Sequence, residues 1–128
     1  MNIIGSTVVL TVEDPAASAR FFVGHLGFRE VLVAQGATHL SRDDAATDII
    51  LRGGAGPDTS RQHPPAQVRA LVSYTVTGIH AEYERLRREG APITLPLRME
   101  PWGEWRLQLT DPNAVVVQLA EWIPPAGA

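Results

Sequence analysis

The residue types that perform most enzyme chemistry are sparse in this sequence. Its 128 residues include no cysteine and no lysine, which excludes thiolate nucleophiles, disulfides, iron–sulfur ligation and Schiff-base catalysis within it. No two of its four histidines have the spacing of a chelating pair. We therefore expect His25, His39, His63 and His80 to be surface or capping residues. A rearranged metal site built from His39 and acidic side chains stays open as an alternative.

The acidic side chains form no recognisable catalytic pair. Asp43 and Asp44 fall in a predicted turn, where solvated carboxylates are usual. Glu100, Glu104 and Glu121 flank the region where a binding surface is predicted. Any of the three could act as a general base if burial raised its pKa, but we expect them to be exposed. Because a GxSxG elbow, a P-loop and a Rossmann glycine run are also absent, we predict no catalytic residue.

Residues suited to binding a flat, largely apolar molecule are concentrated near the C-terminal end. All three tryptophans lie there, Trp102 and Trp105 in one short segment with Met99, and Trp122 on a predicted strand. Indole rings and a flexible thioether form a good surface for stacking a planar ligand. Packing in the core or at a dimer interface is the alternative for Trp105 and Trp122, whereas the neighbouring proline and glycine place Trp102 in a loop.

Hydrophobic alternation and helix signals predict the elements that position these residues, in two similar halves. In the first half, alternation predicts a strand over 7–13, and Asp14-Pro15 with an apolar stripe ending at Gly27 predicts a helix over 15–26. Three short strands follow, at about 28–34, 38–42 and 48–52. The second half predicts a strand over 70–76, a helical stripe from Ile79 to Gly90, and strands at about 92–97, 104–110 and 115–122.

The second half repeats the first after about 64 residues, with Val76 aligned on Val12 and Thr75 on Thr11. We predict an α+β fold with one βαβββ module in each half, so that each four-stranded sheet has a helix on one face. The whole chain, 1–128, is predicted to be a single domain. Module 1 covers 4–53, a linker rich in glycine and proline covers 54–67, and module 2 covers 68–123.

Two stretches of the sequence resemble the vicinal oxygen chelate superfamily. The first runs from VEDP at 12–15 to FF at 21–22 and LGF at 26–28, and the second runs from TDPN at 110–113 to VQL at 117–119. This superfamily includes glyoxalase I, extradiol dioxygenases, fosfomycin-resistance proteins and bleomycin-binding resistance proteins. The resemblance covers about residues 4–123. It implies that the two βαβββ modules form a half-open barrel, with a second subunit completing the cavity.

The same resemblance locates the positions at which metal-dependent members hold their ion. A histidine seven residues before the aspartate that starts the first helix falls on Thr7, and the other ligand positions fall on or near Ile50, on Leu71 and on Gln118. Divalent ions prefer imidazole and carboxylate ligands, whereas these four residues supply at most two weak neutral oxygens. We therefore predict no metal and no cofactor.

Strand alternation also predicts which side chains lie on the concave face, opposite the helices. This face combines small hydroxyls, amides and arginines with the aromatic cluster, a mixture that suits a mostly apolar ligand with a few polar groups. The predicted ligand-binding residues are Thr7, Arg52, Ser73, Met99, Trp102, Trp105, Arg106, Gln108, Gln118 and Trp122.

Composition narrows the partners and the location. The 11 basic residues, all arginine, face 14 acidic ones for a net charge of −3, so nothing favours binding to nucleic acid. No N-terminal signal and no apolar stretch of membrane-spanning length is present, and we expect a soluble, cytoplasmic protein without membrane contact. Basicity from arginine alone, with many alanines, is typical of a GC-rich bacterial genome.

The sequence as a whole favours a homodimeric, metal-free binding protein of the bleomycin-resistance type. It would confer self-resistance by sequestering an aromatic natural-product antibiotic, a task that needs binding alone. One alternative is an enzyme of the same superfamily, a lyase, isomerase or dioxygenase, with a noncanonical metal site or a glutamate base. Another is a protein-interaction or regulatory subunit that uses the fold without a ligand.

Overall fold

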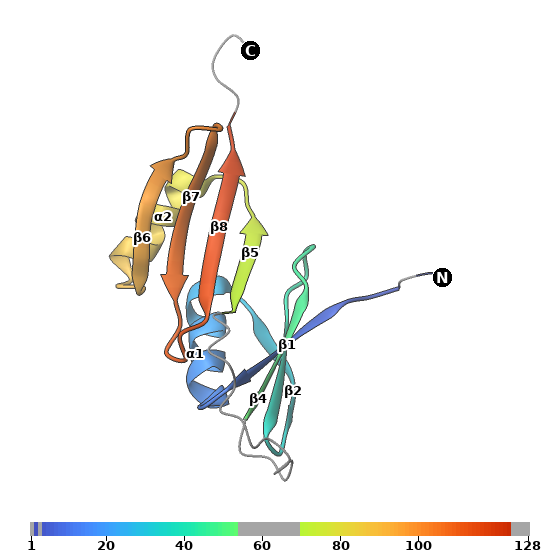
Figure 1. Cartoon of the computed structure of the whole chain (residues 1–128). Coiled ribbons are helices and arrows are strands. Elements are labelled where there is room, and N and C mark those ends of the chain that lie inside the picture. The colour runs from blue at the N-terminus through green and yellow to red at the C-terminus, as the bar shows by residue number, and fades with distance from the viewer. Residues whose placement is uncertain (1, 3, 54–69, 124–128) are drawn as a thin grey trace. The chain divides into compact units, whose positions relative to one another are not determined.

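The computed structural model describes residues 2, 4–53 and 70–123. The chain divides into two compact units, Met1–Val68 and Arg69–Ala128. Within the described residues, each unit contains one helix and four strands in the order βαβββ (Figure 1), which confirms the predicted α+β modules. The predicted linker over 54–67, with His63, lies outside the described residues.

The first unit is a four-stranded mixed sheet with a helix against one face. Its strands have the order β1-β4-β3-β2, with β1 and β4 parallel and the other neighbours antiparallel. The elements are β1 (Thr7–Val12), α1 (Pro15–Leu26), β2 (Arg29–Ala34), β3 (Ala37–Ser41) and β4 (Asp48–Gly53).

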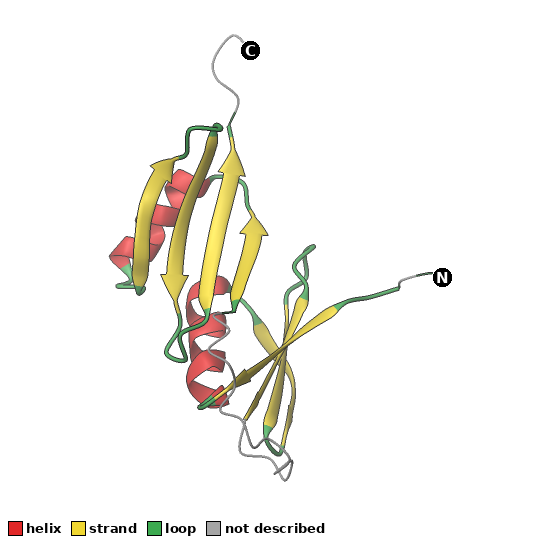
Figure 2. Ribbon diagram, viewed as in Figure 1, coloured by secondary structure: helices red, strands yellow, loops and turns green. Residues whose placement is uncertain are grey.

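The second unit repeats this topology (Figure 2). Its strands have the order β5-β8-β7-β6, again with one parallel pair, β5 and β8. The elements are β5 (Leu71–Thr75), α2 (Ile79–Arg88), β6 (Ile93–Met99), β7 (Glu104–Thr110) and β8 (Val116–Trp122). The helix over 15–26 and the strand over 104–110 have their predicted bounds, and the other predicted strands differ by one or two residues at one or both ends.

Each unit has its own apolar core between the helix and the sheet. In the first unit the core contains Phe22, Leu40, Ile49 and Leu51, all fully buried. In the second it contains Ile79, Leu86, Leu107, Leu109 and Val117, also fully buried. Burying one such side chain stabilises a fold by about 1.5–3 kcal/mol. Because residues alternate along a strand, the other face of each sheet is left to more polar and more exposed side chains.

The start of α1 has the predicted cap. The side chain of Asp14 accepts a hydrogen bond from the backbone N–H of Ala17 at 3.2 Å, which satisfies one of the amides that have no partner in the first turn. Pro15 occupies the first helical position, where its missing N–H costs nothing.

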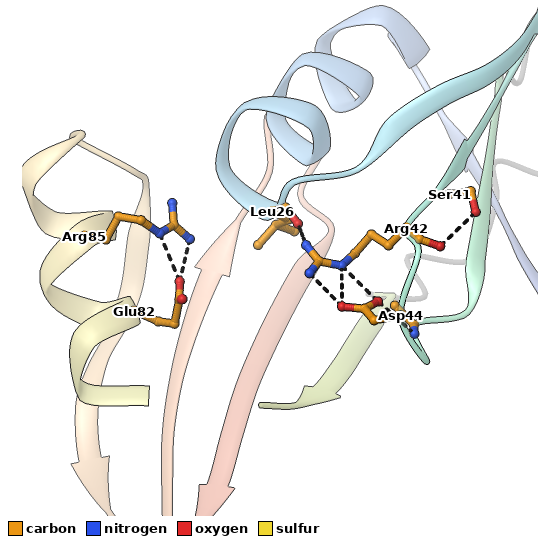
Figure 3. Close-up of polar contacts among 7 residues, drawn as sticks. Leu26, Ser41, Arg42, Asp44, Glu82 and Arg85 are labelled. Carbon is orange, nitrogen blue, oxygen red and sulfur yellow. Dashed lines mark hydrogen bonds and ion pairs between the residues drawn. The ribbon is translucent and has the colours of Figure 1, made fainter. Parts of the chain in front are cut away.

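The end of α1 is closed by a glycine and an arginine. Gly27 has φ 71°, a conformation that glycine adopts without steric cost. Arg42 donates to the carbonyl oxygen of Leu26, and Asp44 in turn accepts from Arg42 Nη2 at 2.7 Å (Figure 3). The pKa of Asp44 lies below its usual value because Arg42 donates to the carboxylate. Asp44 of the acidic pair in this turn therefore has a structural role.

The start of α2 is capped from a distant strand. Its N-cap residue is Gly78, with φ 68° and no side chain to accept a hydrogen bond. Instead the carboxylate of Glu121, on β8, accepts from the backbone N–H groups of Gly78 at 3.1 Å and Ile79 at 3.0 Å. A negative charge at a helix N-terminus is also favourable electrostatically. Glu121 therefore serves as a helix cap. From the sequence, we expect an exposed side chain and a possible general base at this position.

This cap predicts that Glu121→Ala lowers the free energy of unfolding by about 1–2 kcal/mol, because two backbone amides lose their acceptor. Urea denaturation at neutral pH measures the change. The control is Glu84→Ala on the exposed side of α2, where the ion pair to Arg87 is long, at 3.4 Å, and a loss of less than about 0.5 kcal/mol is expected. Equal losses in the two variants would show that Glu121 is no cap.

Candidate functional site

The face of the second sheet opposite α2 carries a connected set of polar side chains that begins at Gln118. Gln118 Oε1 accepts hydrogen bonds from Gln108 Nε2 at 3.0 Å and Arg106 Nη1 at 3.2 Å. Gln118 Nε2 donates to Ser73 Oγ at 3.1 Å. Gln108, Gln118 and Ser73 are direct cross-strand neighbours on β7, β8 and β5. Their side chains therefore meet because the strand register aligns them.

The set continues through Glu100, a carboxylate that two arginines share. Glu100 Oε1 accepts from Arg98 Nε and from Arg106 Nε, each at 2.6 Å, and only 8% of the Glu100 side chain is exposed. The two arginines are opposite each other on β6 and β7. We refer to these side chains together as the Gln118 network: Ser73, Arg98, Glu100, Arg106, Gln108 and Gln118.

The prediction that Glu100 is exposed is wrong, because the residue is 7% exposed. Burial alone would raise its pKa, but the two arginines outweigh that effect. Hydrogen bonds from Arg98 and Arg106 lower the pKa of Glu100 below its usual value of 4.5, because donors and positive charges favour the ionised form. At neutral pH this carboxylate is ionised and already accepts hydrogen bonds from two arginines. It is therefore a poor candidate for a general base.

Exposed aromatic side chains border the network. Trp102 is 63% exposed, and the guanidinium carbon of Arg106 lies 6.0 Å from the centre of its ring, within the range of a cation–π contact. Trp122, 61% exposed, approaches the turn at Gly103, where an added Cβ would lie 3.0 Å from the indole nitrogen. Met99, also exposed, ends β6, but it is paired with Trp105 and alternates with Arg98, so by strand parity it does not share the face of the network as predicted. An apolar, solvent-facing rim thus adjoins the polar network.

Trp105 lies on the other side of the sheet. Its ring meets that of His80, on α2, with the centroids 4.5 Å apart. Trp105 alternates with Arg106 along β7 and shares its side with Leu107 of the core. Of the three tryptophans predicted to bind ligand, this one does not face the Gln118 network.

Thr7 and Arg52 lie on the open face of the first sheet, as alternation predicted, and both are exposed. Arg52 Nε donates to Thr11 Oγ1 at 3.1 Å. The sequence reasoning missed a second cluster on this face, in which the carboxylate of Asp48 binds His39 Nε2 at 2.9 Å and Ser41 Oγ at 2.9 Å. These hydrogen bonds lower the pKa of Asp48. The signal was available, because β3 and β4 pair antiparallel and all three residues have the same strand parity.

The residues at the family's metal positions do not fit a divalent cation. Ile50 and Leu71 offer no donor atom, and Thr7 offers only a hydroxyl. The carbonyl oxygen of Gln118 already accepts from Arg106, whose positive charge would repel a cation. Across residues 2, 4–53 and 70–123, no group of three or more histidine or acidic side chains could hold a metal ion, and His39 with Asp48 makes only two ligands.

Comparison with known proteins identifies the family. The chain matches the Glyoxalase/Bleomycin resistance protein/Dioxygenase superfamily over residues 4–119, and it belongs to this superfamily. No curated protein matches the chain. Within the described ranges, no helix is long and apolar enough to cross a membrane.

Solved structures share the fold at low sequence identity. TioX from Micromonospora sp. ML1 is 22% identical, with a TM-score of 0.73, and the match covers 93% of this chain and 98% of that one. A superfamily member from Sphaerobacter thermophilus is 23% identical, with a TM-score of 0.73 and coverages of 94% and 98%. A lactoylglutathione lyase from Agrobacterium tumefaciens is 15% identical, with a TM-score of 0.71 and coverages of 91%. These similarities establish the fold alone.

The lowered pKa of Glu100 predicts how stability depends on pH. Unfolding returns this carboxyl to its usual pKa of 4.5, so its stabilising effect is present above that pH and is lost as the pH falls through the lower pKa of the folded state. Between about pH 5 and pH 3, the free energy of unfolding should therefore fall more steeply in the unsubstituted protein than in Glu100→Gln. Denaturant titrations at several pH values give both slopes. Equal slopes would contradict the two ion pairs.

Proposed function

We propose that this chain is a small-molecule-binding protein that sequesters an aromatic natural product, without a metal ion and without converting it. We further propose that it does so as a single domain over 1–128, in a homodimer in the bacterial cytoplasm, and that it thereby protects the cell from an antibiotic. The observation that carries the proposal is the open face of the second sheet, where the Gln118 network adjoins the exposed rings of Trp102 and Trp122.

The chemistry of this face suits a planar ligand with a few polar atoms. An exposed indole ring offers a flat apolar surface, and stacking on it contributes about 0.5–1.5 kcal/mol beyond the area buried. The amides and guanidinium groups beside it offer directional donors. Because Gln118, Arg106 and Gln108 hold one another in place, a ligand that binds them loses little side-chain entropy.

The same contacts favour binding over turnover. Glu100 is held as a carboxylate between two arginines, and Glu121 caps α2. Neither is placed to exchange protons with a ligand. Sequestration requires only that the bound ground state be stable, whereas catalysis requires groups that stabilise a transition state more strongly.

One observation favours an enzyme as the second candidate. In the first unit, Asp48 holds the imidazole of His39 in the way that a carboxylate orients a general base. A solved structure named as a lactoylglutathione lyase, which is an enzyme, also has this fold. This candidate predicts conversion of a bound compound and loss of that conversion in His39→Ala.

A thermal-shift screen of the full chain against aromatic antibiotics, followed by mass spectrometry of each stabilising compound, separates the two candidates. Sequestration predicts that the compound is recovered unchanged. It also predicts that elemental analysis finds no stoichiometric metal in the protein. A converted compound, or a tightly bound metal that is lost in His39→Ala, would overturn the proposal in favour of the enzyme.

Trp102→Ala should weaken binding of a compound found in this way by about 1–3 kcal/mol, which titration calorimetry measures. Because Trp102 is 63% exposed, the free energy of unfolding should hardly change. The control is Trp105→Phe, which removes an indole from the opposite side of the sheet and should leave the affinity unchanged. Unaltered affinity in Trp102→Ala would count against the proposed binding surface.

A further inference from the structure

The Gln118 network has an uneven balance of charge. Arg98 and Arg106 both direct Nε at the same oxygen of Glu100, so two positive charges share one negative charge. The anion is the buried member, with 8% of its side chain exposed, whereas 53% of the Arg98 side chain is exposed. This polar cluster therefore presents a positive charge to solvent, in a chain whose net charge is −3.

Most of the N–H donors in these two guanidinium groups have no acceptor among the residues that the structure describes. A guanidinium has five N–H donors. Among the described residues, Arg98 donates only through Nε, and Arg106 through Nε and Nη1. Because Glu100 occupies Nε of Arg98, the edge formed by the two terminal nitrogens is left for another acceptor. That edge is planar and matches the two oxygens of a carboxylate.

The other charged group on this side of β7 is Glu104. It has the same strand parity as Arg106 and is paired with Trp122 on β8. No ion pair joins Glu104 to Arg98 or Arg106 in the part of the chain that the structure describes. Arg98 is on β6, on the opposite side of β7 from Trp122. An anionic group would therefore be favoured near Arg98 and disfavoured at the end of β7 next to Trp122.

We infer that Arg98 and Arg106 form an oxyanion subsite, and that the ligand of this face is an aromatic compound that carries a carboxylate. The inference rests on the proposed function and specifies the class of ligand. Glu100 is the positioning residue, because its buried carboxylate holds both guanidinium groups by Nε. The carboxylate of the ligand binds the terminal nitrogens of Arg98, while its ring system lies against Trp102, which Arg106 also contacts.

Three compounds with one ring system test the inference: 2-naphthoate, its neutral analogue 2-naphthamide, and 2-naphthyl phosphate. Binding to the full chain is measured at low salt from the side-chain NMR signals of the tryptophan indoles and arginine Nε–H groups. We expect 2-naphthoate to bind about tenfold more tightly than 2-naphthamide, the effect of one charge-assisted pair. In Arg98→Gln this preference should disappear while the affinity for 2-naphthamide stays the same. The control, Arg87→Gln on α2, should keep the preference.

The outcomes separate the subsite from the proposed function. Equal binding of 2-naphthoate and 2-naphthamide, or a preference that survives in Arg98→Gln, overturns the subsite and leaves the aromatic binding surface standing. Tighter binding of 2-naphthyl phosphate than of 2-naphthoate overturns the assignment to a carboxylate. If none of the compounds shifts the signals of Trp102 or Trp122, the proposed binding surface fails, and the subsite with it.

Discussion

The two ion pairs that Glu100 makes with Arg98 and Arg106 are the interactions on which the candidate site depends. A carboxylate that is almost fully buried is costly unless its charge is compensated, and here Arg98 and Arg106 approach it at 2.6 Å from neighbouring strands. Arg106 is held by Glu100 through Nε, its Nη1 donates to Gln118, and its guanidinium carbon lies 6.0 Å from the centre of the Trp102 ring. One buried charge thus fixes the positions of the donors and of an aromatic neighbour.

The network also bears on metal binding at Gln118, the position where the superfamily's metal-dependent members have a carboxylate ligand. An amide cannot replace a carboxylate as a strong ligand of a divalent ion, and this amide oxygen is occupied by two protein donors. The positive charge on this face comes from guanidinium groups. A guanidinium recognises an oxygen-rich ligand by directional hydrogen bonds and does not activate it as a Lewis acid does. This difference agrees with a protein that binds its ligand without converting it.

Local sequence signals predicted the fold because they act over short distances. Asp14-Pro15 and Gly27 define α1 by capping geometry, and the alternation of apolar residues on β1 and β7 correctly separates the core side from the open side. The family match confirms the fold that the motifs around α1 and β8 indicated. The four predicted residues Ser73, Arg106, Gln108 and Gln118 do meet, since their strand parity was sufficient to place them on one face.

The parts of the site that were missed depend on pairing between strands. The pairing of β6 with β7 is irregular between Ile93 and Leu95 and again between Leu95 and Arg98. Simple alternation therefore could not show that Arg98 lies opposite Arg106, or that Glu100 is buried between them.

Strand parity alone was enough to place His39 and Asp48 on one face, but their hydrogen bond depends also on the register of β3 and β4. Trp105 could have been assigned from sequence, because its parity places it with Leu107 on the core side.

The most direct test of the account is to locate a bound compound by chemical-shift mapping, using the full chain and the most strongly stabilising aromatic antibiotic. The account predicts shifts at the indole N–H groups of Trp102 and Trp122 and at the side-chain amide of Gln118, with the indole of Trp105 unaffected. Shifts confined to His39 and its neighbours, with the second unit unchanged, would contradict it.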